Sequence, residues 1–272
     1  MRPELCAHHF EAMGTRCSIF AAGISRAGLL EAECQVRALA ARLTRFEASS
    51  EVSRFNASAG AWVSVSPELE ALLRESLRAH ELSTGLVNVA VLPAMEAAGY
   101  TRPLAQGPTA ARLEGAGPVP ALPDVLEVAI GRARVAPGTG IDLGGLAKGW
   151  MADRIAERLG ENVLVNLGGD LRARGRGPAG AGWPVGLGGR TVLLDDHGAA
   201  TSSVLRRRWG GGLHHLIDPR TGRPSDTGLS EVSVVARTAI DAEVVAKAAL
   251  IAGPELAPAF CAAHAEAWWL RR

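Results

Sequence analysis

The sequence is nearly devoid of lysine. Of its 29 basic residues, 27 are arginine and only Lys148 and Lys247 are lysine. It also lacks an excess of either charge, because 28 acidic residues bring the formal net charge to +1. A chain this close to neutrality has no general attraction to phosphate backbones, and it contains no basic block suited to a membrane surface. We therefore expect no nucleic-acid partner, and the two lysines become candidates for a specific role.

Long apolar runs and paired cysteines are also missing. No apolar run approaches the roughly 20 residues needed to cross a bilayer. The first ten residues do not combine a basic start with an apolar stretch, so we expect no membrane insertion, no secretory signal and a cytoplasmic location. The four cysteines, at positions 6, 17, 34 and 261, include no Cys-x-x-Cys pair, which argues against a disulfide framework and against a zinc site.

Apolar periodicity and turn residues predict a mixture of helices and strands. Helices are expected over residues 29–46, 68–82, 109–114, 148–159, 239–252 and 255–264. Strands are expected over residues 13–22, 125–130, 133–136, 162–167, 183–187, 191–194, 214–217, 229–236 and 265–270. Because the two do not alternate strictly, the pattern favours an α+β fold with a mixed, largely antiparallel sheet and flanking helices. We expect one domain over residues 1–272, in which the Pro- and Gly-rich segment 102–123 could separate two subdomains.

A glycine-rich segment at residues 138–150 runs directly into a predicted helix. Glycines at a helix start let backbone N–H groups approach an anion, and the helix dipole and Lys148 add positive charge. This favours a phosphate-bearing ligand, although the spacing matches neither a Walker loop nor a dinucleotide fingerprint. The alternative is a structural turn in which Asp142 caps the helix.

Two further segments carry polar groups near turns. Residues 165–170, Val-Asn-Leu-Gly-Gly-Asp, end a predicted strand in a turn that carries a carboxylate. Farther along, His215 and Asp218 could act as a general base and the group that orients it, because imidazole titrates near neutrality and pairs readily with a carboxylate. A purely structural histidine is the alternative interpretation.

Taken together, these segments resemble the FAD:protein FMN transferases, the ApbE family of flavin transferases. Seven segments match in the order found in that family: residues 13–15, 45–56, 83–93, 141–153, 165–170, 200–203 and 214–222. With the helix that ends near residue 253, they cover nearly the whole chain. Seven ordered matches are far more specific than any one of them.

The resemblance implies an enzyme that binds FAD, splits its pyrophosphate and transfers FMN to a Thr or Ser of an acceptor flavoprotein, releasing AMP. It implies that Lys148 lies at the pyrophosphate and that His215 accepts the proton of the incoming hydroxyl. The positions implied for FAD binding are Met13, Asn56, Asn88, Asp142, Gly144, Gly145, Lys148, Asp153, Thr201, Ser202 and Asp218.

The resemblance breaks down at the implied magnesium site. Family members hold Mg²⁺ with an Asp, a Thr four residues later and a backbone carbonyl of the glycine-rich loop, here at Leu146 or Ala147. The aligned side chains in this sequence are Glu243 and Lys247, and a charged lysine cannot ligate a metal. The ammonium of Lys247 could occupy the position of the metal; the alternative is an ordinary solvated lysine on the surface of the helix. Three interpretations stay open: a transferase with altered cation handling, an FAD-binding homologue without transferase activity, and an unrelated α+β protein.

Overall fold

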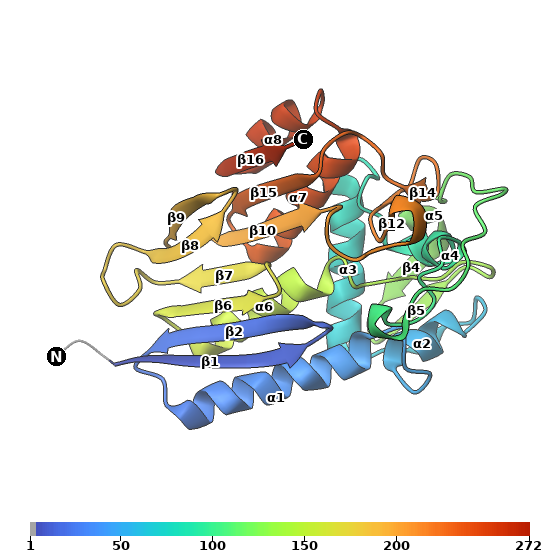
Figure 1. Ribbon diagram of the computed structural model, residues 1–272. Coiled ribbons are helices and arrows are strands. Elements are labelled where there is room, and N and C mark those ends of the chain that lie inside the picture. Colours follow the sequence, from blue (N-terminus) through green and yellow to red (C-terminus); the bar gives the residue numbers. More distant parts are fainter. Residues whose placement is uncertain (1–3) are drawn as a thin grey trace.

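A seven-stranded antiparallel sheet forms one half of the molecule (Figure 1). The computed structural model describes residues 4–272, and the strand order is β1-β2-β6-β7-β10-β15-β16, with every neighbouring pair antiparallel. The first and last of these strands along the chain therefore form the two edges of the sheet. The strands are β1 (Leu5–Ala12), β2 (Thr15–Ala22), β6 (Val163–Leu167), β7 (Leu171–Arg174), β10 (Gly198–Ser203), β15 (Glu231–Ala236) and β16 (Ala267–Arg271).

β1 and β2 form a hairpin whose two turn residues are Met13 and Gly14. Both have a positive φ, 53° and 66°, as a two-residue turn needs if its twist is to match that of the strands. The strand expected over residues 13–22 is therefore wrong at its start, because residue 13 lies in the turn and β2 begins at Thr15. The turn lies at the end of the sheet that faces the other half of the molecule (Figure 1).

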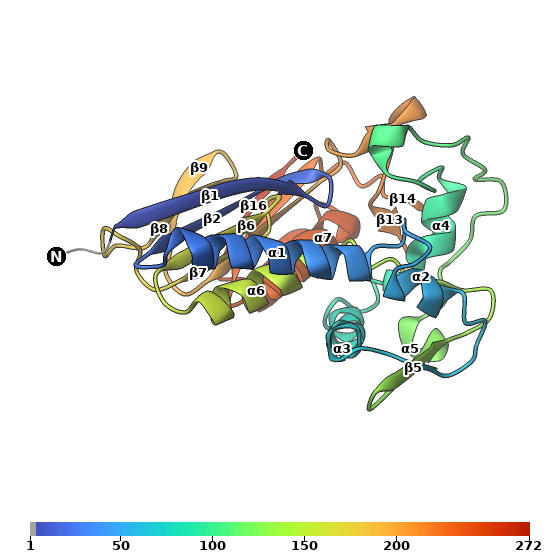
Figure 2. The same ribbon diagram turned by 90° about the horizontal axis from the view of Figure 1, so that it is seen from below.

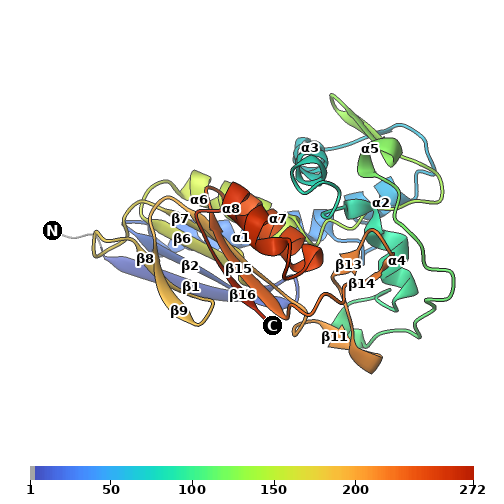
Figure 3. The same cartoon turned by 90° about the horizontal axis from the view of Figure 1, so that it is seen from above.

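Helices cover one face of the sheet, as Figures 2 and 3 show. Alternation along β6 explains the two faces, since Val163 and Val165 pack into the core on the helix side, whereas Leu164 packs on the opposite face. That opposite face is covered by a hairpin of β8 (Trp183–Leu187) and β9 (Arg190–Leu194). The covering helices are α1 (Arg26–Leu43), α6 (Ala147–Leu159), α7 (Ala239–Ala252) and α8 (Ala257–His264).

Helix α7 is buried over most of its length. Its side chains are largely Ala and Val, and they let it contact α6 on one side and strands β10 and β15 on the other. Thr238 caps its start, because Asp241 N donates to Thr238 Oγ1 at 3.1 Å. Glu243 and Lys247 are charged side chains in this mostly apolar, buried helix, and each needs a group of opposite charge or a hydrogen-bond partner.

The second half of the molecule comes mainly from the chain between α1 and α6. A three-stranded sheet in the order β3-β5-β4 packs there beside α3. Short hairpins from later in the chain, β11 with β12 and β13 with β14, join this half through a small core around Tyr100 and Ile217. Its elements are α2 (Glu51–Asn56), β3 (Val63–Ser64), α3 (Pro67–Leu82), η1 (Val89–Val91), α4 (Leu92–Ala97), η2 (Leu104–Gln106), α5 (Leu122–Val125), β4 (Leu126–Ala129), β5 (Arg132–Val135), β11 (Arg208–Trp209), η3 (Gly210–Gly212), β12 (Leu213–His214), β13 (Ile217–Asp218) and β14 (Arg223–Pro224).

The α+β expectation is confirmed, and so are the helices expected over residues 68–82, 148–159 and 239–252. The helix expected over residues 109–114 is wrong, because that segment is tied to a neighbouring loop through Thr109 N to Gly99 O and Arg112 N to Ala97 O. The strand expected over residues 214–217 is also wrong and is divided between β12 and β13. None of the helices in residues 4–272 is both long and apolar enough to span a membrane.

Candidate active site

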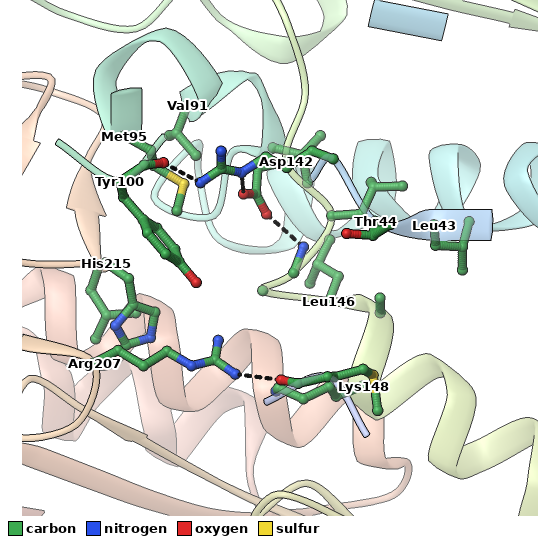
Figure 4. Close-up of a pocket in the computed structure, with 18 of the residues that line it drawn as sticks. Leu43, Thr44, Val91, Met95, Tyr100, Asp142, Leu146, Lys148, Arg207 and His215 are labelled. Carbon is green, nitrogen blue, oxygen red and sulfur yellow. Dashed lines mark hydrogen bonds and ion pairs between the residues drawn. The ribbon is translucent and has the colours of Figure 1, made fainter. Parts of the chain in front are cut away.

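A cavity of about 620 Å³ lies between the two halves of the molecule. It is lined by the end of α1, by residues 86–105, by the glycine-rich loop with the start of α6, and by α7. Figure 4 shows its apolar wall, with Leu43, Val91, Met95 and Leu146, and the polar groups that point into it. A cavity that is mostly apolar and carries a few converging polar groups is typical of a small-molecule site.

The glycine-rich loop is held in place by side chains from the other half of the molecule. Asn56 binds both backbone groups of Ile141: its Nδ2 donates to Ile141 O at 2.9 Å, and its Oδ1 accepts from Ile141 N at 2.9 Å. Asp142 accepts from Gly144 N at 2.7 Å and pairs with the guanidinium of Arg45, which also donates to Tyr100 O at 2.6 Å. The loop is therefore fixed before any ligand arrives.

Four charged side chains, Lys148, Asp170, Glu243 and Lys247, form a buried charge cluster at the start of α6. Lys148 donates to Asp170 Oδ2 and, at 3.0 Å, to Glu243 Oε1. Glu243 Oε2 accepts from Gly149 N at 2.9 Å. Lys247 Nζ lies 3.9 Å from Glu243 Oε1 and donates to the carbonyl oxygen of Gly145. Both lysines line the cavity.

The electrostatics of the charge cluster follow from burial and pairing. Burial opposes the charge of Lys148, but the carboxylates of Asp170 and Glu243 outweigh it and raise the pKa of Lys148 to about 12. Burial, reinforced by the charge of Glu243, raises the pKa of Asp170 to about 6. Burial lowers the pKa of Lys247, and Glu243 works against that shift. The two ammonium groups and the two carboxylates of the charge cluster thus stabilise one another where little solvent reaches them.

His215 and Arg207 line the cavity on the side away from Asp142 (Figure 4). His215 Nδ1 is buried and has no hydrogen-bond partner among the described residues. Burial, together with the positive charges of Arg207 and Lys247, holds the pKa of His215 well below 6.5, so its imidazole is neutral at pH 7. Arg207 has a φ of 50°, a conformation that is rare for residues other than glycine and is often found at functional sites.

Tilted aromatic side chains pack together at one end of the cavity. The ring of Tyr100 lies 5.3 Å from that of Trp209 and 5.5 Å from that of Phe46, measured between centroids. The guanidinium carbon of Arg45 lies 4.3 Å from the Phe46 ring and 4.8 Å from the Tyr100 ring. These aromatic side chains form a surface against which a flat ring system could pack.

The structure brings together many of the residues selected from the sequence. Those that line the cavity are Met13, Asn88, Asp142, Gly144, Gly145, Leu146, Ala147, Lys148, His215 and Lys247. Asn88 has a structural bonding pattern, since its amide donates to Pro120 O at 2.9 Å and accepts from Ala90 N at 2.9 Å. Asn56 and Glu243 do not line the cavity. Glu243 binds Lys148, which does, and Asn56 binds Ile141, the residue before Asp142 in the glycine-rich loop.

Four selected residues lie away from the cavity. The expected pairing of His215 with Asp218 is wrong, because Asp218 accepts hydrogen bonds from the guanidinium of Arg220, the closest at 2.7 Å. Asp153 binds the start of α7 through Ala239 N at 2.9 Å and Ile240 N at 3.0 Å. The last two belong to β10: Thr201 bonds to Ser233 at 2.9 Å across the sheet, and Ser202 is buried.

The cavity residues that sequence reasoning missed include Arg45, Tyr100 and Arg207. Arg45 begins one of the matching segments, which is a signal that could have found it. Arg207 is one of 27 arginines and lies in a run of three, so nothing in the sequence separates it from its neighbours. Tyr100 is the only tyrosine in the sequence, but a buried aromatic residue is more often part of a core than of a site.

Comparison with known proteins supports the resemblance seen in the sequence. A family model described as the ApbE family matches residues 13–269. The chain belongs to the ApbE family. The interpretation as an unrelated α+β protein is therefore wrong.

Relatives of this ApbE-family chain carry names that state an activity. The FAD:protein FMN transferase of Haemophilus influenzae is 27% identical over 253 residues, which cover 84% of this chain and 73% of that protein. The FAD:protein FMN transferase of Salmonella typhimurium is 29% identical over 262 residues, which cover 85% of this chain and 74% of that protein.

Solved structures show the same fold. The apo form of the Pseudomonas stutzeri flavinyl transferase ApbE superposes with a TM-score of 0.84 at 23% identity, covering 99% of this chain and 93% of that one. The ApbE protein of Thermotoga maritima superposes with a TM-score of 0.86 at 24% identity, covering 98% and 94% of the two chains. The sheet, its helices and the second half of the molecule thus belong to one ApbE fold.

Proposed function

We propose that this protein transfers FMN from FAD to the hydroxyl group of a Thr or Ser side chain on an acceptor flavoprotein and releases AMP. The observation that carries the proposal is the cavity of an ApbE-family chain, lined both by the neutral imidazole of His215 and by the ammonium groups of Lys148 and Lys247. A proton acceptor beside fixed positive charge is what the attack of a hydroxyl on a pyrophosphate requires.

The cavity suits a dinucleotide that carries a flat ring. Its volume of about 620 Å³ falls in the range of small-molecule sites, which is about 300–1,000 Å³. The apolar wall and the ring of Tyr100 would bind the flavin, while Lys148, Lys247 and Arg207 would meet the pyrophosphate. Asn56, Arg45 and Asp142 act indirectly, because they hold the loop against which the ligand packs.

The chemistry is a phosphoryl-group transfer. The acceptor oxygen forms a bond to the phosphorus on the FMN side, the bond from that phosphorus to the bridging oxygen breaks, and its electron pair leaves with AMP. The hydroxyl proton passes to the imidazole of His215. Positive charge from the lysines and Arg207 stabilises the charge that develops on the phosphate oxygens. Because an anionic pyrophosphate offsets the charges of Arg207 and Lys247, its binding should make His215 a stronger base.

Magnesium does not fit the residues at the position that the resemblance implies. The carbonyl of Gly145 and one oxygen of Glu243 already face ammonium groups, and the second oxygen of Glu243 accepts from Gly149 N. The carbonyl of Leu146 accepts from Trp150 N at 3.1 Å inside α6. In residues 4–272, no group of three or more His, Cys, Asp or Glu side chains is placed to hold a metal ion. Mg²⁺ needs about six oxygen ligands, so no step is assigned to it.

Replacement of His215 by alanine tests the proposal. The protein is incubated with FAD, and AMP is measured by chromatography, with transfer followed as flavin fluorescence that stays on an added flavoprotein after denaturation. His215→Ala should lower turnover by about 10²–10⁴-fold, the range for a general base, and leave FAD affinity nearly unchanged. His214→Ala is the control, because His214 bonds to Ser225 O at 2.9 Å and does not line the cavity.

Two results would contradict the proposal. Equal turnover in His215→Ala and the unaltered protein would show that His215 is not the general base. Tight FAD binding without AMP release in any buffer would favour the second interpretation, an FAD-binding homologue without transferase activity.

The proposal also covers the domain organisation of the chain and the cellular location of the protein. We treat residues 1–272 as one domain, supported by a hydrophobic core that joins Leu73 and Val87 from the second half to Ile155 and Leu167 from the sheet half. The cytoplasmic location stays a prediction, to be tested by cell fractionation, and the acceptor flavoprotein is to be identified by the flavin that it carries.

A further inference from the structure

The position of Lys247 in the charge cluster points to a role that the proposed function alone does not define. Its ammonium is anchored by the carbonyl of Gly145, on the glycine-rich loop, and by Glu243, one turn earlier on α7. The side chain is only 13% exposed and is surrounded on its own helix by Ala246, Ala248 and Ala249, all fully buried. Lysine is rarely buried to this degree unless its charge is paired.

The loop makes room for this ammonium. A Cβ atom at Gly145 would lie 2.5 Å from Lys247 Nζ and 3.2 Å from its Cε, so no larger residue fits without moving the lysine. The φ of Gly145 is not in the positive range, so the backbone conformation does not itself require glycine, and what a larger residue would displace is the flexible end of the Lys247 side chain. Loop and lysine are therefore complementary in shape.

The ammonium has donors left over. It carries three N–H groups, and in the described residues it makes a single hydrogen bond, to Gly145 O, while Glu243 Oε1 lies at 3.9 Å. Lys148 uses two of its three N–H groups on Asp170 and Glu243. Arg207 donates to Met13 O at 3.5 Å and forms no ion pair with a described carboxylate. All three side chains line the same cavity, so their spare donors are available to a ligand that binds there.

We propose that Lys247 is the built-in cation of this site, that its ammonium binds an oxygen of the substrate's pyrophosphate, and that binding and transfer are therefore independent of divalent metal. This rests on the proposed function, because it assumes a substrate with a pyrophosphate. A fixed ammonium held at the loop carbonyl and beside Glu243 is already oriented when the substrate arrives, so no reorganisation is needed at the moment of reaction. It repels a divalent ion from the same place.

The test compares FAD with riboflavin, which lacks the phosphates. Affinities are measured by flavin fluorescence in MgCl₂ and in EDTA for the unaltered protein, Lys247→Met, Gly145→Ala and Gly186→Ala. Lys247→Met keeps most of the side-chain length and leaves Glu243 paired with Lys148 and Gly149 N. Gly186→Ala is the control for Gly145→Ala, because a Cβ atom there meets nothing within 4 Å.

Metal independence predicts that the affinity of the unaltered protein for FAD is the same in MgCl₂ and in EDTA. Lys247→Met should weaken FAD binding about 10- to 100-fold, the range for losing a hydrogen bond to a charged group, and leave riboflavin binding unchanged. Gly145→Ala should act in the same direction, and Gly186→Ala should change neither affinity. Unchanged riboflavin binding also shows that a variant has folded.

The outcomes separate this inference from the proposed function. FAD binding that tightens strongly with Mg²⁺, or a Lys247→Met variant with unaltered FAD affinity, would overturn the inference and leave the transferase proposal standing. Equal loss of FAD and riboflavin binding in Lys247→Met would also overturn it, because the lysine would then be structural. Failure of the unaltered protein to bind FAD in either buffer would overturn the proposed function itself.

Discussion

Replacement of Glu243 by glutamine should destabilise the protein severely, although the change is nearly isosteric. Glu243 Oε1 lies 3.0 Å from Lys148 Nζ and 3.9 Å from Lys247 Nζ, and its side chain is 5% exposed. At these distances and an effective dielectric constant of about 20, each ammonium is attracted by about 4–6 kcal/mol before desolvation is counted. Glutamine can keep the bond from Gly149 N, but it leaves two buried ammonium groups with one carboxylate, Asp170, in the charge cluster.

The expected loss in the free energy of unfolding is about 3–5 kcal/mol, the cost of removing one partner from a buried ion pair. For a chain of this size that corresponds to a fall in melting temperature on the order of 10 °C. Urea denaturation followed by circular dichroism measures the first quantity and calorimetry the second. Glu127→Gln is the control, since Glu127 pairs with Arg134 at an exposed site and should matter little.

A second substitution makes the test more specific. If the loss comes from unbalanced charge, Lys247→Met in the Glu243→Gln background should recover part of it, although the two changes together remove an ion pair. Glu243→Gln with the stability of the unaltered protein, or a double variant less stable than the two single losses combined, would refute the electrostatic account of the charge cluster.

Four further outcomes are expected. The kcat/KM for transfer should stay level as the pH falls through 6.5, because the pKa of His215 lies well below that value, and a decline centred at 6.5 would show an ordinary, exposed imidazole. The contribution of His215 to folding stability should decrease over the same fall, since the unfolded imidazole takes up a proton that the folded one does not bind, whereas Asp170, whose pKa is raised to about 6, contributes in the opposite direction. Asn56→Ala should cost about 1–3 kcal/mol in the free energy of unfolding and weaken FAD binding, because the buried N–H of Ile141 loses its acceptor; unfolding curves and FAD titration measure the two effects. Glu243→Asp combined with Lys247→Thr should produce Mg²⁺ binding detectable by isothermal titration calorimetry, since the ammonium that covers Gly145 O is gone.

The sequence alone determined the helices with regular apolar spacing and the family. Helix α7 was predicted over residues 239–252, the bounds that the structure has, because Gly253-Pro254 marks its end. Helix α3 was predicted within one residue because Ser66 and Pro67 mark its start. These signals are local, so they can be interpreted without knowing where the rest of the chain lies.

Strands without local signals were found only in the structure. Strand β10, with the sequence Gly-Ala-Ala-Thr-Ser-Ser, has no apolar alternation and exists because it pairs with β15 and β7. Strand β7 is short and begins directly after a turn. Both segments form strands because neighbouring strands pair with them, which agrees with the strong dependence of strand formation on context.

The residues of the candidate active site likewise fall into those that the sequence identified and those that only the tertiary structure identified. Lys148, Lys247 and His215 were selected from the sequence, because lysine is rare in this chain and imidazole is suited to proton transfer. Their partners were decided by tertiary structure: Glu243 lies 95 residues from Lys148, and Gly145 lies 102 residues from Lys247. Asp218, only three residues from His215, turned out to pair with Arg220. Buried charge is stabilised by whichever opposite charge the fold brings within reach, and distance along the chain does not predict that.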